Sequence, residues 1–126
     1  MARVRGRDSV PELIVRSLVH RLGYRFRLQA SELPGRPDLV FRPRQKAIFV
    51  HGCFWHSHNR CTGARVPKSR HAFWSNKLSA NKARDRRNLS ALTRLGWSYL
   101  VIWECEIHAL ESVAGKIMEF LDSREV

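Results

Sequence analysis

The sequence lacks the features of membrane and secreted proteins. No apolar run among its 126 residues approaches the roughly 20 residues that a membrane-spanning helix needs. The first residues, MARVRGRDS, are basic and lead into no apolar stretch like that of a secretory signal. Cysteine occurs only three times, an odd number that disfavours a secreted disulfide scaffold. We therefore expect a soluble cytoplasmic protein without membrane association.

Acidic residues are also scarce. The chain has 11 Asp and Glu against 23 Lys and Arg, which gives a net charge of +12. Residues 60–94 hold ten bases and one acid, whereas residues 104–126 hold six acids and two bases. Such a basic block predicts a surface that binds a polyanion. The alternative is a solvated, charged helix without a ligand.

The length suits one domain with a single core, so we expect residues 1–126 to form one domain. Residues 1–8 form a short basic N-terminal arm in this interpretation. Hydrophobic periodicity and turn residues predict helices and strands. The expected helices are 10–22, 75–95 and 108–121, and the expected strands are 24–29, 38–41, 46–50 and 97–104. This order predicts an α/β fold with a mixed central sheet flanked by helices.

Two details of packing also follow from the pattern. Strand 97–104, WSYLVIWE, is apolar enough to be central in the sheet, with Trp97 and Trp103 in or beside the core. Helix 75–95 buries a stripe of leucines. These are Leu78, Leu89, Leu92 and Leu95.

The segment HGCFWHSHNRC, residues 51–61, contains metal-ligating side chains at close spacing. Cys53, His58 and Cys61 are ligands of the kind that zinc prefers, and a structural zinc site needs four. Cys105 supplies the fourth if strands 46–50 and 97–104 run parallel and adjacent. Otherwise Cys105 is a small buried apolar residue.

Asp38 opens one strand, and the next strand ends at His51. An aspartate in this position resembles the PD-(D/E)xK nucleases, but Phe49-Val50-His51 replaces their usual carboxylate and lysine. The motif alone is a weak match.

Five blocks in order resemble the very-short-patch-repair (Vsr) mismatch endonucleases, from about Arg7 to Ile107. They read LPGRPDLVF, HGCFWH, VPKSRHAFW, NKARDRR and LGWSYLVIWECEI. The resemblance implies a single restriction-endonuclease-like domain with a zinc-tied loop, in which Phe-x-His replaces Glu-x-Lys.

The resemblance also implies roles for individual residues. Asp38 matches the magnesium-binding aspartate, and Glu12 matches an acid that supports the metal and water network. His51 matches the first catalytic histidine, and His56 matches the general base. Val50 stands where the family has threonine. If this position binds Mg²⁺ through its backbone carbonyl, valine serves equally well, and if the threonine hydroxyl takes part, activity falls. Magnesium suits these oxygen ligands, and phosphodiester cleavage needs such charge neutralisation.

By the same resemblance, Cys53, His58, Cys61 and Cys105 hold a structural zinc. An alternative has His56 as the zinc ligand and His58 exposed. One more residue separates the zinc histidine from the next cysteine here than in the family. The family's longer N-terminal arm is reduced to MARVRGR, which affects the grip on mismatched DNA more than the chemistry.

DNA contacts form the last group of expectations. The resemblance makes Phe54, Trp55 and Trp74 aromatic wedges that unstack bases, and the alternative is that these rings pack beneath the loop. Basic residues are candidates for phosphate contacts. They are Arg65, Lys68, Arg70, Lys77, Lys82, Arg84, Arg86 and Arg87.

The resulting hypothesis is a Mg²⁺-dependent, zinc-stabilised endonuclease that nicks one strand of double-stranded DNA at T:G mismatches. It would act as a monomer in the bacterial cytoplasm at the nucleoid, together with mismatch-repair proteins. Two alternatives remain open. One is a related, homing-type nuclease without mismatch specificity, and the other is a zinc-stabilised DNA-binding module without catalysis.

Overall fold

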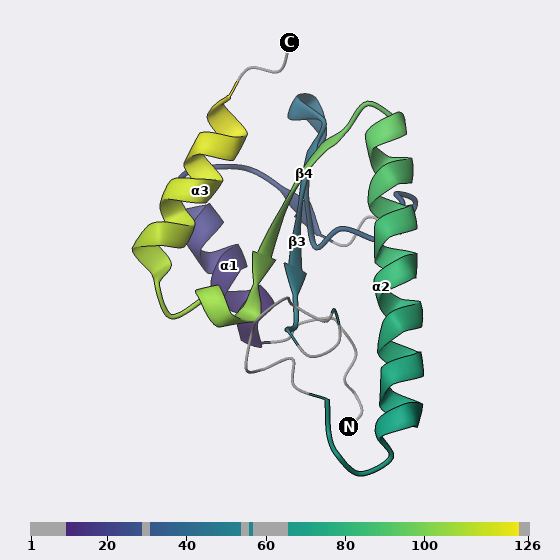
Figure 1. Cartoon of the computed structure of the whole chain (residues 1–126). Coiled ribbons are helices and arrows are strands. Elements are labelled where there is room, and N and C mark those ends of the chain that lie inside the picture. Colours follow the sequence, from purple (N-terminus) through teal and green to yellow (C-terminus); the bar gives the residue numbers. More distant parts are fainter. Residues whose placement is uncertain (1–9, 29–30, 54–55, 57–65, 124–126) are drawn as a thin grey trace.

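The computed structural model describes residues 10–28, 31–53, 56 and 66–123 (Figure 1). Its helices are α1 (Val10–Arg21), α2 (His71–Arg94) and α3 (Leu110–Asp122), and its strands are β1 (Arg27–Leu28), β2 (Leu39–Phe41), β3 (Lys46–His51) and β4 (Ser98–Trp103). Two short 3₁₀ segments are η1 (Arg42–Arg44) and η3 (Glu104–Glu106). Within these ranges, no helix combines the length and apolar character that crossing a membrane requires.

The four strands form one mixed sheet in the order β1-β2-β3-β4. β1 and β3 each pair antiparallel with β2, and β4 pairs parallel with β3. The parallel adjacency of the last two strands, which was the condition for Cys105 to lie near Cys53, is present, with His51 opposite Trp103. The central position expected for β4 is wrong, because β4 lies at the edge of this sheet. Its apolar character comes from helices that cover both of its faces, not from strands on both sides.

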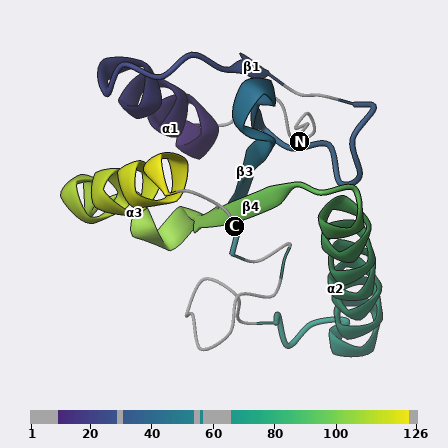
Figure 2. The ribbon, with the colours of Figure 1, turned by 90° about the horizontal axis from the view of Figure 1, so that it is seen from above.

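Helices cover both faces of the sheet, with α1 and α3 on one side and α2 on the other (Figure 2). Side chains of β2 alternate between the two layers. Leu39 and Phe41 pack with α1 and α3, and Val40 packs in the smaller cluster with Leu92 of α2. The α/β fold with a mixed sheet between helices agrees with the prediction.

Several boundaries differ from those expected. Within the described residues 24–28 of the predicted strand 24–29, the strand covers Arg27–Leu28, which pair with two residues of the short β2. α2 begins at His71 instead of residue 75 and ends at Arg94. Leu95 therefore lies outside the helix and is 57% exposed instead of buried. Trp97 and Trp103 are half-buried.

A buried lysine joins the sheet to the end of α3. Lys46 is 3% exposed, and its ammonium donates hydrogen bonds to the carbonyl oxygens of Phe120 (2.6 Å) and Ser123 (2.8 Å). The last carbonyls of a helix have no partners within the helix and carry a partial negative charge. Lys46 therefore stabilises the C-terminus of α3 with its charge and its three donors.

Candidate active site

Asp38 is held at the junction of β2 and β3. Its amide N–H donates to the carbonyl oxygen of Ile48 (3.1 Å), which extends the ladder between the two strands by one residue. One carboxylate oxygen, Oδ2, accepts a hydrogen bond from the amide of Val50 (2.7 Å). The Asp38 carboxylate thus lies beside the backbone of Val50, near the C-terminal end of β3.

A second carboxylate lies in the same region. Glu12, in the first turn of α1, is 1% exposed, and Arg16 donates to its Oε2 at 2.7 Å. Burial raises the pKa of Asp38 to about 7, and the charge of Glu12 adds to the rise, while the hydrogen bond from Val50 and the charge of Arg16 oppose it. A carboxylate whose charge is disfavoured by burial and by a neighbouring carboxylate suits a cation.

Two stacked histidines form the other half of the site. His51, the last residue of β3, is 8% exposed, and its ring lies parallel to that of His56 with the centroids 3.8 Å apart. His56 Nδ1 lies 2.5 Å from Oδ2 of Asp85 on α2. The carboxylate fixes the orientation of the His56 ring and directs its Nε2 away from Asp85.

The surroundings of His51 are aromatic. The centroid of its ring lies 5.2 Å from that of Trp103 and 5.7 Å from that of Phe49, both in edge-on contacts. Burial lowers the pKa of His51 to about 3, and the neighbouring His56 adds to this effect. His51 is therefore neutral at physiological pH and can donate from one nitrogen and accept at the other.

His51, His56 and Asp85 each present a ligand atom within 4.8 Å of the others, so this group is a candidate for holding a metal ion. Two imidazoles and one carboxylate suit a borderline transition metal better than magnesium, which prefers oxygen ligands. The same geometry also suits a catalytic histidine oriented by a carboxylate.

Of the four residues expected to bind zinc, the structure describes two. Cys53 is buried and Cys105 is half-buried, and each follows a strand end by two residues, in β3 and β4 respectively. The Cys53 amide donates to Oε1 of Glu104 at 3.3 Å, which links the two strand ends. His58 and Cys61 lie outside the described residues.

The described residues among those expected to contact DNA lie on α2 and in the turn before it. Phe54, Trp55 and Arg65 lie outside the described part of the chain. Trp74 is half-buried and meets the ring of its neighbour Phe73 at 5.1 Å. The remaining candidates are all exposed: Lys68, Arg70, Lys77, Lys82, Arg84, Arg86 and Arg87.

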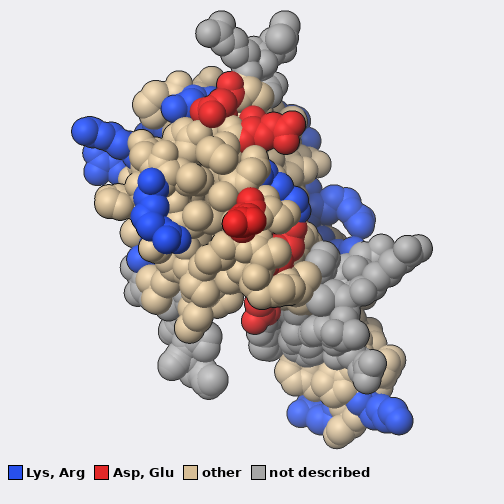
Figure 3. All heavy atoms as spheres, turned by 90° about the vertical axis from the view of Figure 1, so that its left-hand side faces the viewer, with Lys and Arg blue, Asp and Glu red and all other residues tan. Residues whose placement is uncertain are grey.

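The basic residues expected to contact DNA gather on one side of the molecule. Figure 3 shows the side that lies on the left in Figure 1, formed by α1 and α3, where Asp and Glu side chains lie among Lys and Arg side chains. The basic candidates belong to α2 and the turn before it, on the other side of the sheet. A polyanion is therefore expected at the α2 side, where His51 and His56 also lie.

Two residues at the site, Asp85 and Trp103, and one at the start of α2, Phe73, were not predicted to have a functional role. Asp85 is the single acidic residue in the basic block 60–94, and this is the feature of the sequence that could have indicated a functional role. Trp103 was assigned to the core, yet it packs against His51. Phe73 is 45% exposed with the Arg70 guanidinium 4.2 Å from its ring centre, and nothing in the pattern separated it from Trp74.

Comparison with known proteins gives consistent matches. A family model described as "DNA mismatch endonuclease Vsr" matches residues 1–62. The type II nicking enzyme V.XorIIP of Xanthomonas oryzae pv. oryzae is 48% identical over 122 residues, which cover 97% of this chain and 89% of that protein. The DNA mismatch endonuclease Vsr of Escherichia coli is 41% identical over 118 residues, or 94% of this chain and 75% of that protein. The type II nicking enzyme V.NmeAIP of Neisseria meningitidis is 35% identical, covering 85% and 76% respectively.

Proposed function

The chain belongs to the Vsr family of DNA mismatch endonucleases and is a DNA nicking endonuclease, and from this premise we propose that it cuts one strand of a duplex at a T:G mismatch in a reaction that needs Mg²⁺. The observation that carries the proposal is the grouping of His51, His56 and Asp85 at the strand end that also holds Asp38. A DNA-binding module without catalysis has no need for carboxylates beside a phosphate.

The metal is assigned to the carboxylate side of the site. Asp38, supported by Glu12 and by the backbone carbonyl of Val50, would hold Mg²⁺. The fit rests on the donor set: a buried carboxylate with a pKa raised to about 7 beside a second carboxylate gains most from a divalent cation. When bound, Mg²⁺ neutralises charge on the phosphate and lowers the pKa of a coordinated water.

The two histidines are assigned to proton transfer and to hydrogen bonding. His56 accepts the proton of the attacking water, and Asp85 holds its ring at 2.5 Å and stabilises the positive charge that forms. His51 stays neutral because burial lowers its pKa to about 3, so it donates a hydrogen bond to the phosphate without bringing a charge. Trp103 and Phe49 keep the His51 ring in place.

A structural zinc ion is the second metal in the proposal. Cys53, His58, Cys61 and Cys105 form a donor set that suits tetrahedral zinc. Support comes from the parallel pairing of β3 and β4, which carries Cys53 and Cys105 to the same end of the sheet. The zinc would tie down the loop between Cys53 and Cys61, including the wedge candidates Phe54 and Trp55.

Mismatch specificity is tested with two end-labelled duplexes that differ only in one T:G pair. We expect a nick in the T strand of the mismatched duplex and no cut in the paired one. His56→Ala should slow the nick by about 10²- to 10⁴-fold, as expected for loss of a general base. Equal cutting of both duplexes would replace the proposal with the second candidate, a nicking enzyme without mismatch specificity. The relatives V.XorIIP and V.NmeAIP are named type II nicking enzymes, and these names do not mention a mismatch.

A further inference from the structure

A surface pocket of about 370 Å³ lies between the C-terminal half of α2 and the start of β4, and we call it the α2–β4 pocket. It is lined by Arg86, Leu89, Ser90, Thr93, Arg94 and Tyr99. The lining contains two guanidinium groups and three hydroxyls but no carboxylate. Within the described part of the chain, neither arginine forms an ion pair with an acidic side chain.

The hydroxyl groups complement the arginines. The Thr93 hydroxyl donates its proton to the carbonyl of Leu89 at 3.0 Å, so the hydroxyl donors that remain for a ligand are those of Ser90 and Tyr99. Tyr99 is 39% exposed, and its ring is held edge-on against Phe49 with the centroids 6.4 Å apart. Guanidinium and hydroxyl donors without a competing carboxylate are the chemistry that binds phosphate oxygens.

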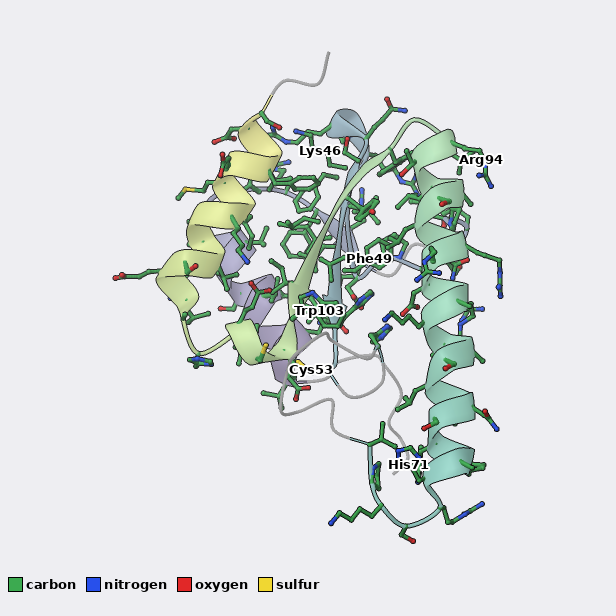
Figure 4. The ribbon with its side chains drawn as sticks, viewed as in Figure 1. Lys46, Phe49, Cys53, His71, Arg94 and Trp103 are labelled. Atoms are coloured by element: carbon green, nitrogen blue, oxygen red, sulfur yellow. The ribbon has the colours of Figure 1, made fainter. Side chains whose placement is uncertain are left out.

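The pocket lies on the same side of the sheet as the catalytic histidines. A row of ring contacts runs from Tyr99 through Phe49 to His51. On α2, Asp85 contacts His56, and the next residue, Arg86, lines the pocket. Figure 4 shows Arg94 at the far end of α2 from His71, with Phe49 between the level of Arg94 and that of Trp103.

The distance along β4 is long enough to span several backbone phosphates. Tyr99 and Trp103 are four positions apart in β4, which corresponds to about 13 Å along an extended strand. A DNA strand carries one phosphate for roughly every 3.4 Å of helix axis. A duplex cut at the histidines therefore has further phosphates within reach of the pocket.

We propose that the α2–β4 pocket binds one backbone phosphate of the DNA, a few nucleotides from the nick, through Arg86 and Arg94. The proposal rests on the active-site assignment above, because the position of the nick determines which phosphate of the strand lies at the pocket. The pocket anchors the strand beyond the cleavage point and aligns the scissile phosphate with His56. It reads no sequence, since a phosphate contact carries none.

Binding without cleavage tests the pocket separately from catalysis. The affinity of the full chain for a fluorescent duplex is measured by anisotropy in the absence of Mg²⁺. We expect Arg86→Gln and Arg94→Gln each to weaken binding by about tenfold and to reduce the salt dependence by about one phosphate contact. Arg27→Gln is the matched control, because Arg27 is exposed on β1, at the opposite edge of the sheet.

The position of the phosphate that the pocket binds is tested with a series of duplexes. Each duplex carries one neutral methylphosphonate, at successive positions around the nick. We expect Arg94→Gln to cost little affinity when one particular phosphate, a few nucleotides from the nick, is already neutral. A loss that is the same for every methylphosphonate position, or no greater than that of Arg27→Gln, would overturn the proposal. This experiment measures only the affinity for DNA. Its result can therefore be interpreted even if the enzyme shows no mismatch specificity or if the catalytic residues are assigned wrongly.

Discussion

Replacing Asp38 by Asn should stabilise the protein at alkaline pH while it abolishes activity. The pKa of Asp38 is raised from 3.8 to about 7, chiefly by burial. The folded protein therefore holds this proton more tightly than the unfolded chain does. The resulting contribution to stability is fully present below pH 3.8 and is lost as the pH rises through about 7. Asn keeps an oxygen that can accept the hydrogen bond from Val50 but cannot ionise.

The magnitude follows from the same pKa difference. A pKa raised by about three corresponds to about 4 kcal/mol of unfolding free energy at pH 8, and to less than about 1 kcal/mol near pH 4. We expect urea unfolding, followed by tryptophan fluorescence, to show Asp38→Asn more stable than the wild type by a margin that grows across this range. Added Mg²⁺ should narrow the margin at pH 8, because it binds the wild type selectively.

A control separates this effect from a general change of charge. Asp122 is exposed and accepts a hydrogen bond from Tyr24, so Asp122→Asn makes the same chemical change outside the site. We expect Asp122→Asn to show no comparable gain between pH 4 and pH 8. The reasoning fails if Asp38→Asn is no more stable than the wild type at pH 8, or if its advantage is independent of pH.

Three further predictions follow from contacts of single side chains. The folded protein binds a proton at His51 only near pH 3, whereas the unfolded chain binds it near pH 6.5, so the wild type loses stability as the pH falls below 6.5. His51→Gln should remove about 2 kcal/mol of this loss at pH 5, measured by urea unfolding. An unchanged loss of stability on acidification would contradict this. Asp85→Asn should slow single-turnover nicking by about 100-fold, since it removes the charge that orients His56 and stabilises its protonated form; a rate within threefold would reject that role. Lys46→Met should lower the unfolding free energy by about 2–3 kcal/mol because it leaves carbonyls of α3 without donors, whereas the exposed Lys116→Met should cost less than about 1 kcal/mol.

Local patterns were sufficient to predict most of the fold. The apolar runs 38–41 and 46–50, separated by turn residues, and the helical periodicity of the segments that form α1 and α3 produced the correct elements and fold class. The parallel pairing of β3 with β4 was stated only as the condition under which Cys53 and Cys105 reach the same end of the sheet, and the structure meets that condition.

Properties that depend on tertiary contacts were harder to infer. The edge position of β4 is set by which strands pair, and an apolar strand covered by helices on both faces resembles a central strand in its sequence. Asp85 lies 29 residues from His56, so no local spacing could reveal their contact. Lys46 is polar in an apolar strand, and its buried position is explained only by the C-terminal carbonyls of α3.

The most direct test of the proposed catalytic site is the single-turnover rate of nicking by Asp38→Ala in Mg²⁺, measured beside the wild type and Asp122→Ala. Loss of a metal-binding carboxylate should remove several kcal/mol of transition-state stabilisation. We therefore expect Asp38→Ala to be slower by about 1000-fold or more, while Asp122→Ala cuts at the wild-type rate. A rate for Asp38→Ala within about tenfold of the wild type would contradict the assignment of the metal to this carboxylate.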